Sequence, residues 1–246
     1  MYDPKGNGKD RTVQTVRFAE FEPPAHLRGI VHRYIELRTT GPLAEDYRFH
    51  ALPDACTYVV FDQLDRSVTG AARLRAKSEE FNLGRQFHFL NIRFLPGVWN
   101  DKVEPVLGGM VDRSYSGDMP YNKIATMLAG QDVDAQLDTL TQLVEHLVAR
   151  GVVGPNDITA RIFQNLDDIG SVADMAEITG LSARQLQRRL KQSAGFAPHD
   201  LLKILRLQQS LDGTASWSYA DQSHFIHAFR NATGYTPGKY AKNFDV

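Results

Sequence analysis

The sequence predicts an α+β protein in which a β-rich N-terminal part precedes an all-α C-terminal part. Residues 17–110 contain short runs of β-branched and aromatic residues separated by Gly and Pro turns, a pattern typical of strands. From residue 131 onward the apolar residues recur every three or four positions, as in amphipathic helices. The stretch GVVGPND, residues 151–157, separates the two patterns, and no strand-like alternation follows it.

The N-terminal part is expected to be a small barrel or sandwich, because short strands follow one another with regular turns. The clearest strands are 56–62, 67–76 and 87–96. In the third of these, His88, Leu90, Ile92 and Phe94 share one parity, so one face of the strand should be largely apolar. Residues 24–37 are expected to form a short helix that leads into a strand.

Composition is that of an ordinary globular protein. Of 246 residues, 42% are hydrophobic and 23% are charged, which argues against global disorder and fibrous folds. The net charge of −1 gives no indication of nucleic-acid binding. A single cysteine, Cys56, excludes an internal disulfide and suits a reducing cytoplasm; we interpret it as a buried apolar residue rather than a nucleophile.

Membrane insertion and export are not expected. No segment approaches the roughly 20 apolar residues that a membrane-spanning helix needs. Residues 1–16 are polar and lack the apolar region of a signal peptide, so they are expected to be a flexible tail.

A helix is predicted over residues 131–150. Its apolar seam consists of Val133, Leu137, Leu140, Val144 and Leu147, at alternating steps of four and three. Two interpretations are open: the helix packs on the β-rich part, or it pairs with a second copy of the chain, since this spacing suits a two-helix contact.

Residues 171–193 have the pattern of a helix-turn-helix. Ser171 is suited to cap a first helix, and Gly180 to end it in the left-handed conformation. Ser182 then begins a second helix, where Gln185 completes a capping box.

The second helix is expected to have one apolar and one basic face. Leu186 and Leu190 point one way with Ala183, while the opposite side carries Arg184, Gln187, Arg188 and Lys191. Arg pairs with guanine and Gln with adenine in the major groove, which makes this face a candidate reading head. The basic character is local: residues 182–206 hold six Lys and Arg side chains against one acid, Asp200. The alternative is a solvated helix face without specific contacts.

Residues 158–244 resemble the DNA-binding domain of the AraC/XylS family of transcriptional regulators. The resemblance rests on LSARQLQRRLKQSAGFAP, LLKILRLQQSL and YADQSHFIHAFRNATGYTPGKY. It implies two helix-turn-helix units joined by a long helix, in a bacterial, cytoplasmic protein that binds double-stranded DNA. It implies base-facing positions for Arg184, Gln187 and Arg188 on the first recognition helix, and for Gln222, Ser223, His224 and His227 on the second. From the basic stretch, Lys191 and Arg206 are further candidates for DNA contact.

The N-terminal part is similar, less specifically, to the cupin-like sensor domains attached to such regulators, on the stretches FHALPDACTYVVFD and IRFLPGVW. The hypothesis for this part is that it senses a small-molecule effector or dimerises, and the resemblance names no effector. Aromatic residues that would line a pocket, or simply form the core, are Tyr58, Phe61, Phe87, Phe89 and Phe94. The expected domains are a tail (1–16), a sensor domain (17–130), a linker helix (131–154) and a DNA-binding domain (155–246).

Two features depart from the family pattern. The second helix-turn-helix unit lacks room for its first helix, so we predict that it is shortened, with Trp217 and Tyr219 filling the vacated space. His227 stands where relatives commonly carry a positive residue, and an ordinary histidine is mostly neutral at pH 7.

These departures leave an alternative function, in which the chain has impaired DNA binding and acts through a protein partner. An enzyme is not expected. The sequence contains no His-x-His pair, phosphate-binding loop, Gly-x-Ser-x-Gly or His-Glu-x-x-His motif, so neither a metal nor another cofactor is predicted. Asp54, which follows Pro53, is interpreted as a turn residue.

Overall fold

The structure is a computed structural model that describes residues 2–4, 8–211 and 219–245, with the backbone alone described for residues 219–222 and 224. The strands are β1 (Val16–Phe21), β2 (Val31–Thr39), β3 (Arg48–Ala51), β4 (Thr57–Asp62), β5 (Thr69–Arg73), β6 (Glu79–Asn82), β7 (His88–Phe94) and β8 (Leu107–Gly108). The helices are α1 (Tyr121–Leu128), α2 (Val133–Ala149), α3 (Asp157–Gln164), α4 (Val172–Thr179), α5 (Ala183–Ser193), α6 (Pro198–Leu211), α7 (Tyr219–Thr233) and α8 (Pro237–Asn243). Short 3₁₀ turns occupy Ala25–Leu27 and Leu166–Asp168.

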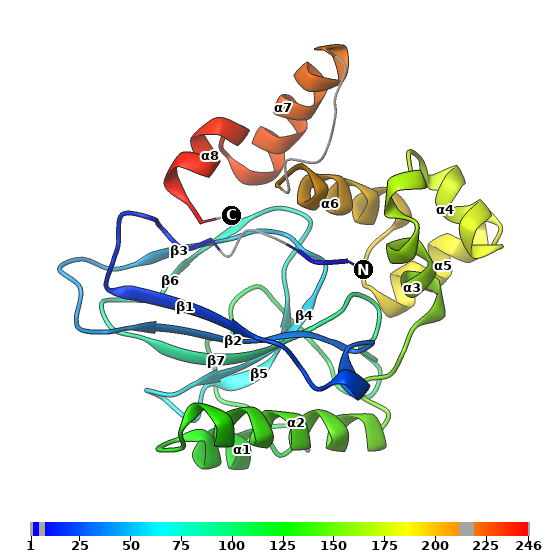
Figure 1. Cartoon of the computed structure of the whole chain (residues 1–246). Coiled ribbons are helices and arrows are strands. Elements are labelled where there is room, and N and C mark those ends of the chain that lie inside the picture. Colours follow the sequence, from blue (N-terminus) through cyan, green and yellow to red (C-terminus); the bar gives the residue numbers. More distant parts are fainter. Residues whose placement is uncertain (1, 5–7, 212–218, 246) are drawn as a thin grey trace.

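The N-terminal part is built on a six-stranded sheet with the order β1-β2-β7-β4-β5-β8, while β3 and β6 pair in a separate two-stranded sheet. Neighbouring strands are antiparallel except for β5 and β8. Helices α1 and α2 lie along one side of the large sheet, and β3 and β6 lie on the other (Figure 1). The predicted α+β class and the three clearest strands are confirmed, since β4, β5 and β7 fall within the expected segments.

Strand β7 is buried on both faces. Leu90, Ile92 and Phe94 are almost fully buried, as the parity of the sequence predicts. On the other face Phe89 and Arg93 are buried as well, because the β3–β6 sheet covers that side. A second layer suits the predicted barrel or sandwich, but the sequence did not indicate β3 and β6 as its strands, since their four residues carry little apolar alternation.

Helix α2 packs against the large sheet. Leu140, Leu143, Val144 and Leu147 are buried in the core, and the Tyr34 hydroxyl on β2 hydrogen-bonds to Thr141 Oγ1 at 2.9 Å. Most of the predicted seam is therefore covered within the chain, in agreement with the first of the two interpretations. A homodimer through this helix would have to use its outward side.

One hydrophobic core runs from the sheet into helices α3–α6. Asn156 Nδ2, at the start of α3, donates to the Gly97 carbonyl at 2.9 Å, and a short bridge pairs Trp99 with Val153. The β-rich and helical parts are thus in contact over buried side chains.

The N-terminal residues are part of this contact, in contrast to the expectation of a flexible tail. Tyr2 is 3% exposed; its ring stacks on Phe163 of α3 at 4.7 Å and its hydroxyl donates to the Asp54 carbonyl. Asp10 bridges to Phe244 near the C-terminus. Burial of an aromatic ring explains why these residues are held despite the polar composition around them.

Candidate nucleic-acid interface

Helices α4 and α5 form a helix-turn-helix whose ends are fixed by the residues that the sequence predicts. Ser171 Oγ accepts a hydrogen bond from the Asp174 amide, and Gly180 ends α4 with φ of 68°. At the start of α5, Ser182 Oγ accepts from the Gln185 amide and Gln185 Oε1 accepts from the Ser182 amide. These reciprocal bonds are the predicted capping box.

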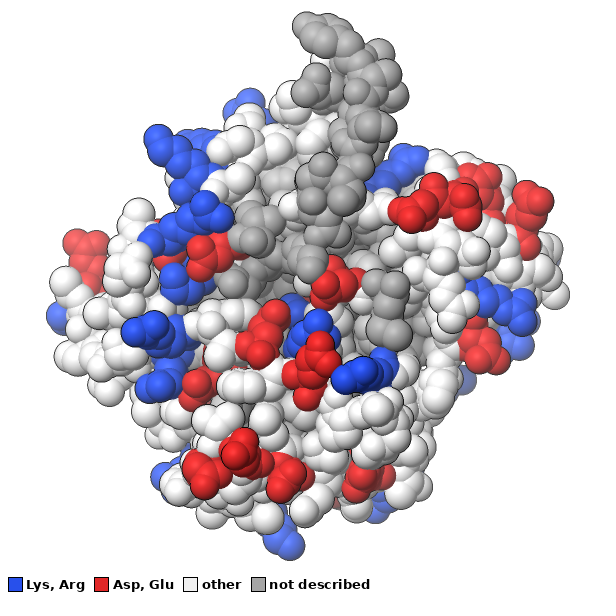
Figure 2. All heavy atoms as spheres, in the orientation of Figure 1, with Lys and Arg blue, Asp and Glu red and all other residues white. Residues whose placement is uncertain are grey.

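Helix α5 presents one buried and one exposed face. Leu186 and Leu190 are fully buried against the neighbouring helices, while the exposed side chains are those of Arg184, Gln187, Arg188, Arg189 and Lys191. Ala183, expected on the apolar face, is exposed because it occupies the first position of the helix. Figure 2 shows positive side chains over α5 at the right-hand edge of the molecule.

Four of the predicted contact residues lie together on this face: Arg184, Gln187, Arg188 and Lys191. Within the described ranges, none of these four side chains makes a hydrogen bond or an ion pair. Their charged and amide groups are therefore available to an external partner, and the buried leucines hold the helix that carries them.

The basic residues of α6 are arranged differently. Arg206 donates from Nη2 to the carbonyl of Gly170, just before α4, so this side chain ties α6 to the helix-turn-helix. Lys203 lies 3.7 Å from Asp200 in an exposed ion pair. Of the predicted contact residues, Arg206 is the one held by the protein itself within α4–α6.

The other four predicted residues lie on α7. Ser223 and His227 are exposed, whereas the side chains of Gln222 and His224 are outside the described residues. Helix α6 ends at Leu211 and α7 begins at Tyr219, so seven residues separate them. Seven residues span about 10 Å as a helix, less than a scaffold helix with its turn needs. The predicted packing of Trp217 and Tyr219 falls outside the described side chains.

The β-rich part supplies a surface on which α7 and α8 pack. Leu52, just after β3, joins Leu207, Phe229, Tyr240 and Phe244 in one buried cluster. His50 Nε2, on β3, donates a hydrogen bond to the Thr233 carbonyl at 3.0 Å, so Nε2 carries the proton. Its ring stacks on Phe244 at 4.9 Å. Helices α7 and α8 are thus held against His50 and Leu52, at the end of β3.

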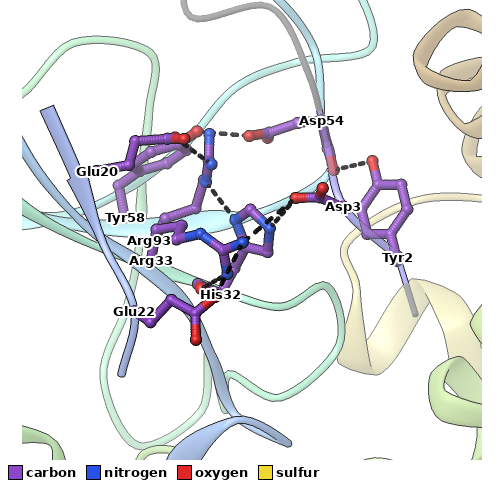
Figure 3. A network of polar contacts seen from close by, with 9 residues as sticks. All are labelled: Tyr2, Asp3, Glu20, Glu22, His32, Arg33, Asp54, Tyr58 and Arg93. Carbon is purple, nitrogen blue, oxygen red and sulfur yellow. Dashed lines mark hydrogen bonds and ion pairs between the residues drawn. The ribbon is translucent and has the colours of Figure 1, made fainter. Parts of the chain in front are cut away.

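A buried polar network joins β7 to the N-terminus (Figure 3). Arg93 donates from Nη2 to Glu20 at 2.5 Å and from Nε to His32 Nδ1 at 2.9 Å. The hydroxyl of Tyr58 donates to Asp54 Oδ2, and burial raises the pKa of that carboxyl group. Asp54, which the sequence indicated only as a turn residue, is therefore also a buried hydrogen-bond acceptor. The sequence around Asp54 gave no sign of this network, because Arg93 lies far away along the chain.

His32 is held neutral in this network. Its Nε2 donates to Asp3 and its Nδ1 accepts from Arg93, so the ring has no place for a second proton. Burial, reinforced by the Arg93 charge, lowers the pKa of His32 to about 3.

We expect this histidine to make the protein less stable in acid. The unfolded chain binds a proton at His32 below about pH 6.5, whereas the folded protein does so near pH 3, so the stabilisation is complete above 6.5 and is lost as the pH falls through that window. At pH 5 the loss should be about 2 kcal/mol. Urea unfolding at pH 7.5 and pH 5 should show this extra loss in the parent relative to His32→Gln, whose amide keeps both hydrogen bonds. Equal losses in the two proteins would show that His32 is not responsible.

Three further features that the sequence analysis considered are a reactive cysteine, a metal site and a membrane-spanning helix. Cys56 is fully buried, and burial raises the pKa of its thiol well above the usual range, so the reactive thiolate is disfavoured. Among the described residues no group of three or more His, Cys, Asp and Glu side chains is arranged to hold a metal ion. None of the described helices is long and apolar enough to cross a membrane.

The geometry of α4 and α5 is that of a helix-turn-helix domain. Comparison with known proteins indicates which type of helix-turn-helix domain this is. Residues 175–243 match the family model of a helix-turn-helix domain. Over 93 residues the chain is 26% identical to the HTH-type transcriptional regulator MtrA of Neisseria gonorrhoeae; the aligned part is 33% of this chain and 31% of that protein. The chain carries a helix-turn-helix domain of the AraC type.

Comparison with solved structures aligned the chain with ToxT from Vibrio cholerae. The superposition has a TM-score of 0.42 with 9% sequence identity, and it covers 92% of this chain and 98% of that one.

Proposed function

We propose that the protein is a sequence-specific DNA-binding regulator of transcription and that α5 is its main reading head. The observation that carries the proposal is the face of Arg184, Gln187, Arg188 and Lys191, exposed and without partners in the described structure, on a helix whose other face is buried. In a helix-turn-helix, such a face enters the major groove and contacts base edges. The name of the aligned relative, a transcriptional regulator, agrees with this role.

Within the proposal, the helical part from residue 155 contacts DNA and the β-rich part from residue 17 modulates it. Arg184 and Arg188 would pair with guanine, Gln187 with adenine, and Lys191 with a phosphate. Ser223 and His227 would add weaker contacts from α7. The alternative, a chain with impaired DNA binding that acts through a protein partner, receives no support from the comparisons.

The two ends of α2 offer a place for a homodimer. Val133 in the first turn and Val148 in the last turn are about two-fifths exposed, at 42% and 38%. Two copies joined in this way would present two α5 helices to a repeated DNA site, which would compensate for a weak second unit.

The proposal is tested by fluorescence anisotropy with labelled DNA at a series of salt concentrations. Because the cations of α5 would displace counterions from phosphates, we expect affinity to fall roughly 100-fold or more between about 50 and about 200 mM salt. A scrambled duplex of the same length should bind more weakly than a site selected from a random pool. Absence of binding to any pool sequence at low salt, by protein shown to be folded, would contradict the proposal.

A further inference from the structure

One buried histidine on β3 carries much of the contact with α7 and α8. His50 is 6% exposed, and its Nε2 donates to the carbonyl of Thr233, the last residue of α7. Three aromatic rings surround the imidazole, with centroids 4.9 to 5.5 Å away; they belong to Phe244, Tyr235 and Tyr240. His50 therefore lies among apolar groups at the place where the two helices meet the strand.

The other ring nitrogen of His50 has no partner. Nδ1 is buried and makes no hydrogen bond to any described residue. In the neutral ring this nitrogen is only an acceptor, because the proton is on Nε2. A second proton on Nδ1 would place a positive charge among apolar side chains with no acceptor for its N–H group. Such a charge is far less favourable in a buried site than the neutral ring.

The acid nearest to this histidine in the sheet compensates only weakly. Glu80 on β6 is the partner of His50 in the β3–β6 ladder. Its side chain is about half exposed, and it already pairs with Arg48 at 3.2 Å. The face of an aromatic ring such as Phe244 also attracts a cation. Burial nevertheless prevails: it lowers the pKa of His50, against smaller opposing effects of the Thr233 carbonyl and the Glu80 charge.

Other charged groups on the elements packed around His50 are either paired or positive. At the joined chain ends, Asp245 pairs with Lys9 and Arg11, and Asp10 Oδ1 accepts hydrogen bonds from Thr12. The charged side chains described on α7 and α8 are all cations, namely Arg230, Lys239 and Lys242. These cations do not favour a further positive charge between the helices and β3.

We propose that His50 is a pH-sensitive contact: its neutral ring holds α7 and α8 against β3, and proton uptake by Nδ1 in acid releases the two helices. An effect of this release on DNA rests on the proposed function, because α7 carries predicted contact residues. The release itself does not depend on that function.

The sign of the effect follows from the two states of the ring. When α7 and α8 leave β3, His50 meets water and has its ordinary pKa of about 6.5, whereas in the contact its pKa is lower. The contact is therefore at full strength above about pH 6.5 and weakens as the pH falls below that value. Each unit by which the pKa is lowered corresponds to a change of about 10-fold in the equilibrium.

The release can be local, because α7 and α8 lie at one side of the molecule, next to β3 (Figure 1). Their buried residues form a small cluster separate from the main core, which includes the leucines of α5. Their backbone contacts with the β-rich part are a bond from Ser78 to Ala232 and the pairing of residues 9–11 with 243–245. The main core does not depend on these contacts, so they can open while the rest of the protein stays folded.

Amide hydrogen exchange of the full chain at pH 7.5 and pH 5 tests the release. Protection factors are compared, since they correct for the pH dependence of the chemical step. We expect protection in α8 to fall by roughly 3-fold to 30-fold at pH 5, beyond any fall in α2, which reports unfolding of the main core. In His50→Gln, whose amide keeps a donor for Thr233 but takes up no proton, this extra fall should be absent. An equal fall in α2 and α8 of the parent, or an extra fall that persists in the variant, would overturn the proposal.

The matched control is His146→Gln. His146 is an exposed histidine on α2, so its replacement should leave the extra fall in α8 as large as in the parent. If this variant also loses the extra fall, His50 is not the group responsible.

Nuclear magnetic resonance of the histidine ring nitrogens gives a second readout in the parent protein. At pH 7.5 His50 should carry its proton on Nε2, and it should titrate below pH 6.5 together with the signals of Thr233. A ring protonated on Nδ1 alone, or a titration at or above pH 6.5, would overturn the proposal. Neither measurement involves DNA, so its failure and a failure of the proposed DNA binding are distinguishable.

Discussion

Replacing Arg184 and Arg188 together with alanine should weaken binding to the selected DNA site by roughly 30-fold to 10,000-fold. Each guanidinium that pairs with a guanine contributes about 1–3 kcal/mol, and both side chains are exposed on the same face of α5. Sequence preference should also relax, because the two side chains would read bases in addition to neutralising phosphates. Anisotropy titrations against the selected site and a scrambled duplex measure both effects.

The matched control for this variant is Arg66→Ala. Arg66 is also an exposed arginine, but it lies in the turn between β4 and β5, away from α5. Its loss should leave affinity unchanged. Unfolding free energies of both proteins should stay close to that of the parent, since none of the three side chains is buried. If the α5 variant binds DNA as tightly and as selectively as the parent, the reading head lies elsewhere.

The largest effect on stability is expected from Arg93→Met. The guanidinium of Arg93 is buried, at 4% exposure, and it is the cation that faces Glu20 within the network. Methionine keeps most of the apolar stem but leaves Glu20 without its ion pair and His32 Nδ1 without its donor. Breaking a fully buried pair costs about 3–5 kcal/mol. Because Glu20 is 36% exposed and can be hydrated in the variant, we expect a loss of about 2–3 kcal/mol.

Arg48→Met is the comparison for this second variant. Arg48 pairs with Glu80 at 3.2 Å, a similar partner, but both side chains are about half exposed, at 61% and 49%. An exposed pair contributes at most about 1 kcal/mol. Chemical denaturation of the two variants and the parent measures the difference, and equal losses would show that burial does not set the strength of the Arg93 network.

Local features of the helix-turn-helix were predictable because their causes lie within a few residues. Ser171, Gly180, Ser182 and Gln185 take the capping roles expected of them, since a cap depends on the next three residues of the same helix. The periodicity of α2 was likewise visible, because four of its leucine and valine side chains face one core.

Contacts between distant segments were not predictable in this way. Tyr2 stacks on Phe163, and His50 meets Thr233, across more than a hundred residues of sequence. The residues next to Asp54 in the sequence do not predict that its carboxyl group is buried, since the side chains around it come from several strands. The contact of α7 with Leu52, just after β3, belongs to the same class, because the sequence around α7 gives no sign of the surface on which it packs.

The claim on which the account depends is that the exposed face of α5 lies in the major groove of DNA. Methylation interference on the selected site tests it most directly, because methyl groups at guanine N7 block the major groove and those at adenine N3 block the minor groove. We predict that N7 methylation of one or two guanines prevents binding by the parent and has little further effect on the variant with Arg184→Ala and Arg188→Ala. Interference confined to adenine N3, or an identical N7 pattern in parent and variant, would contradict the account.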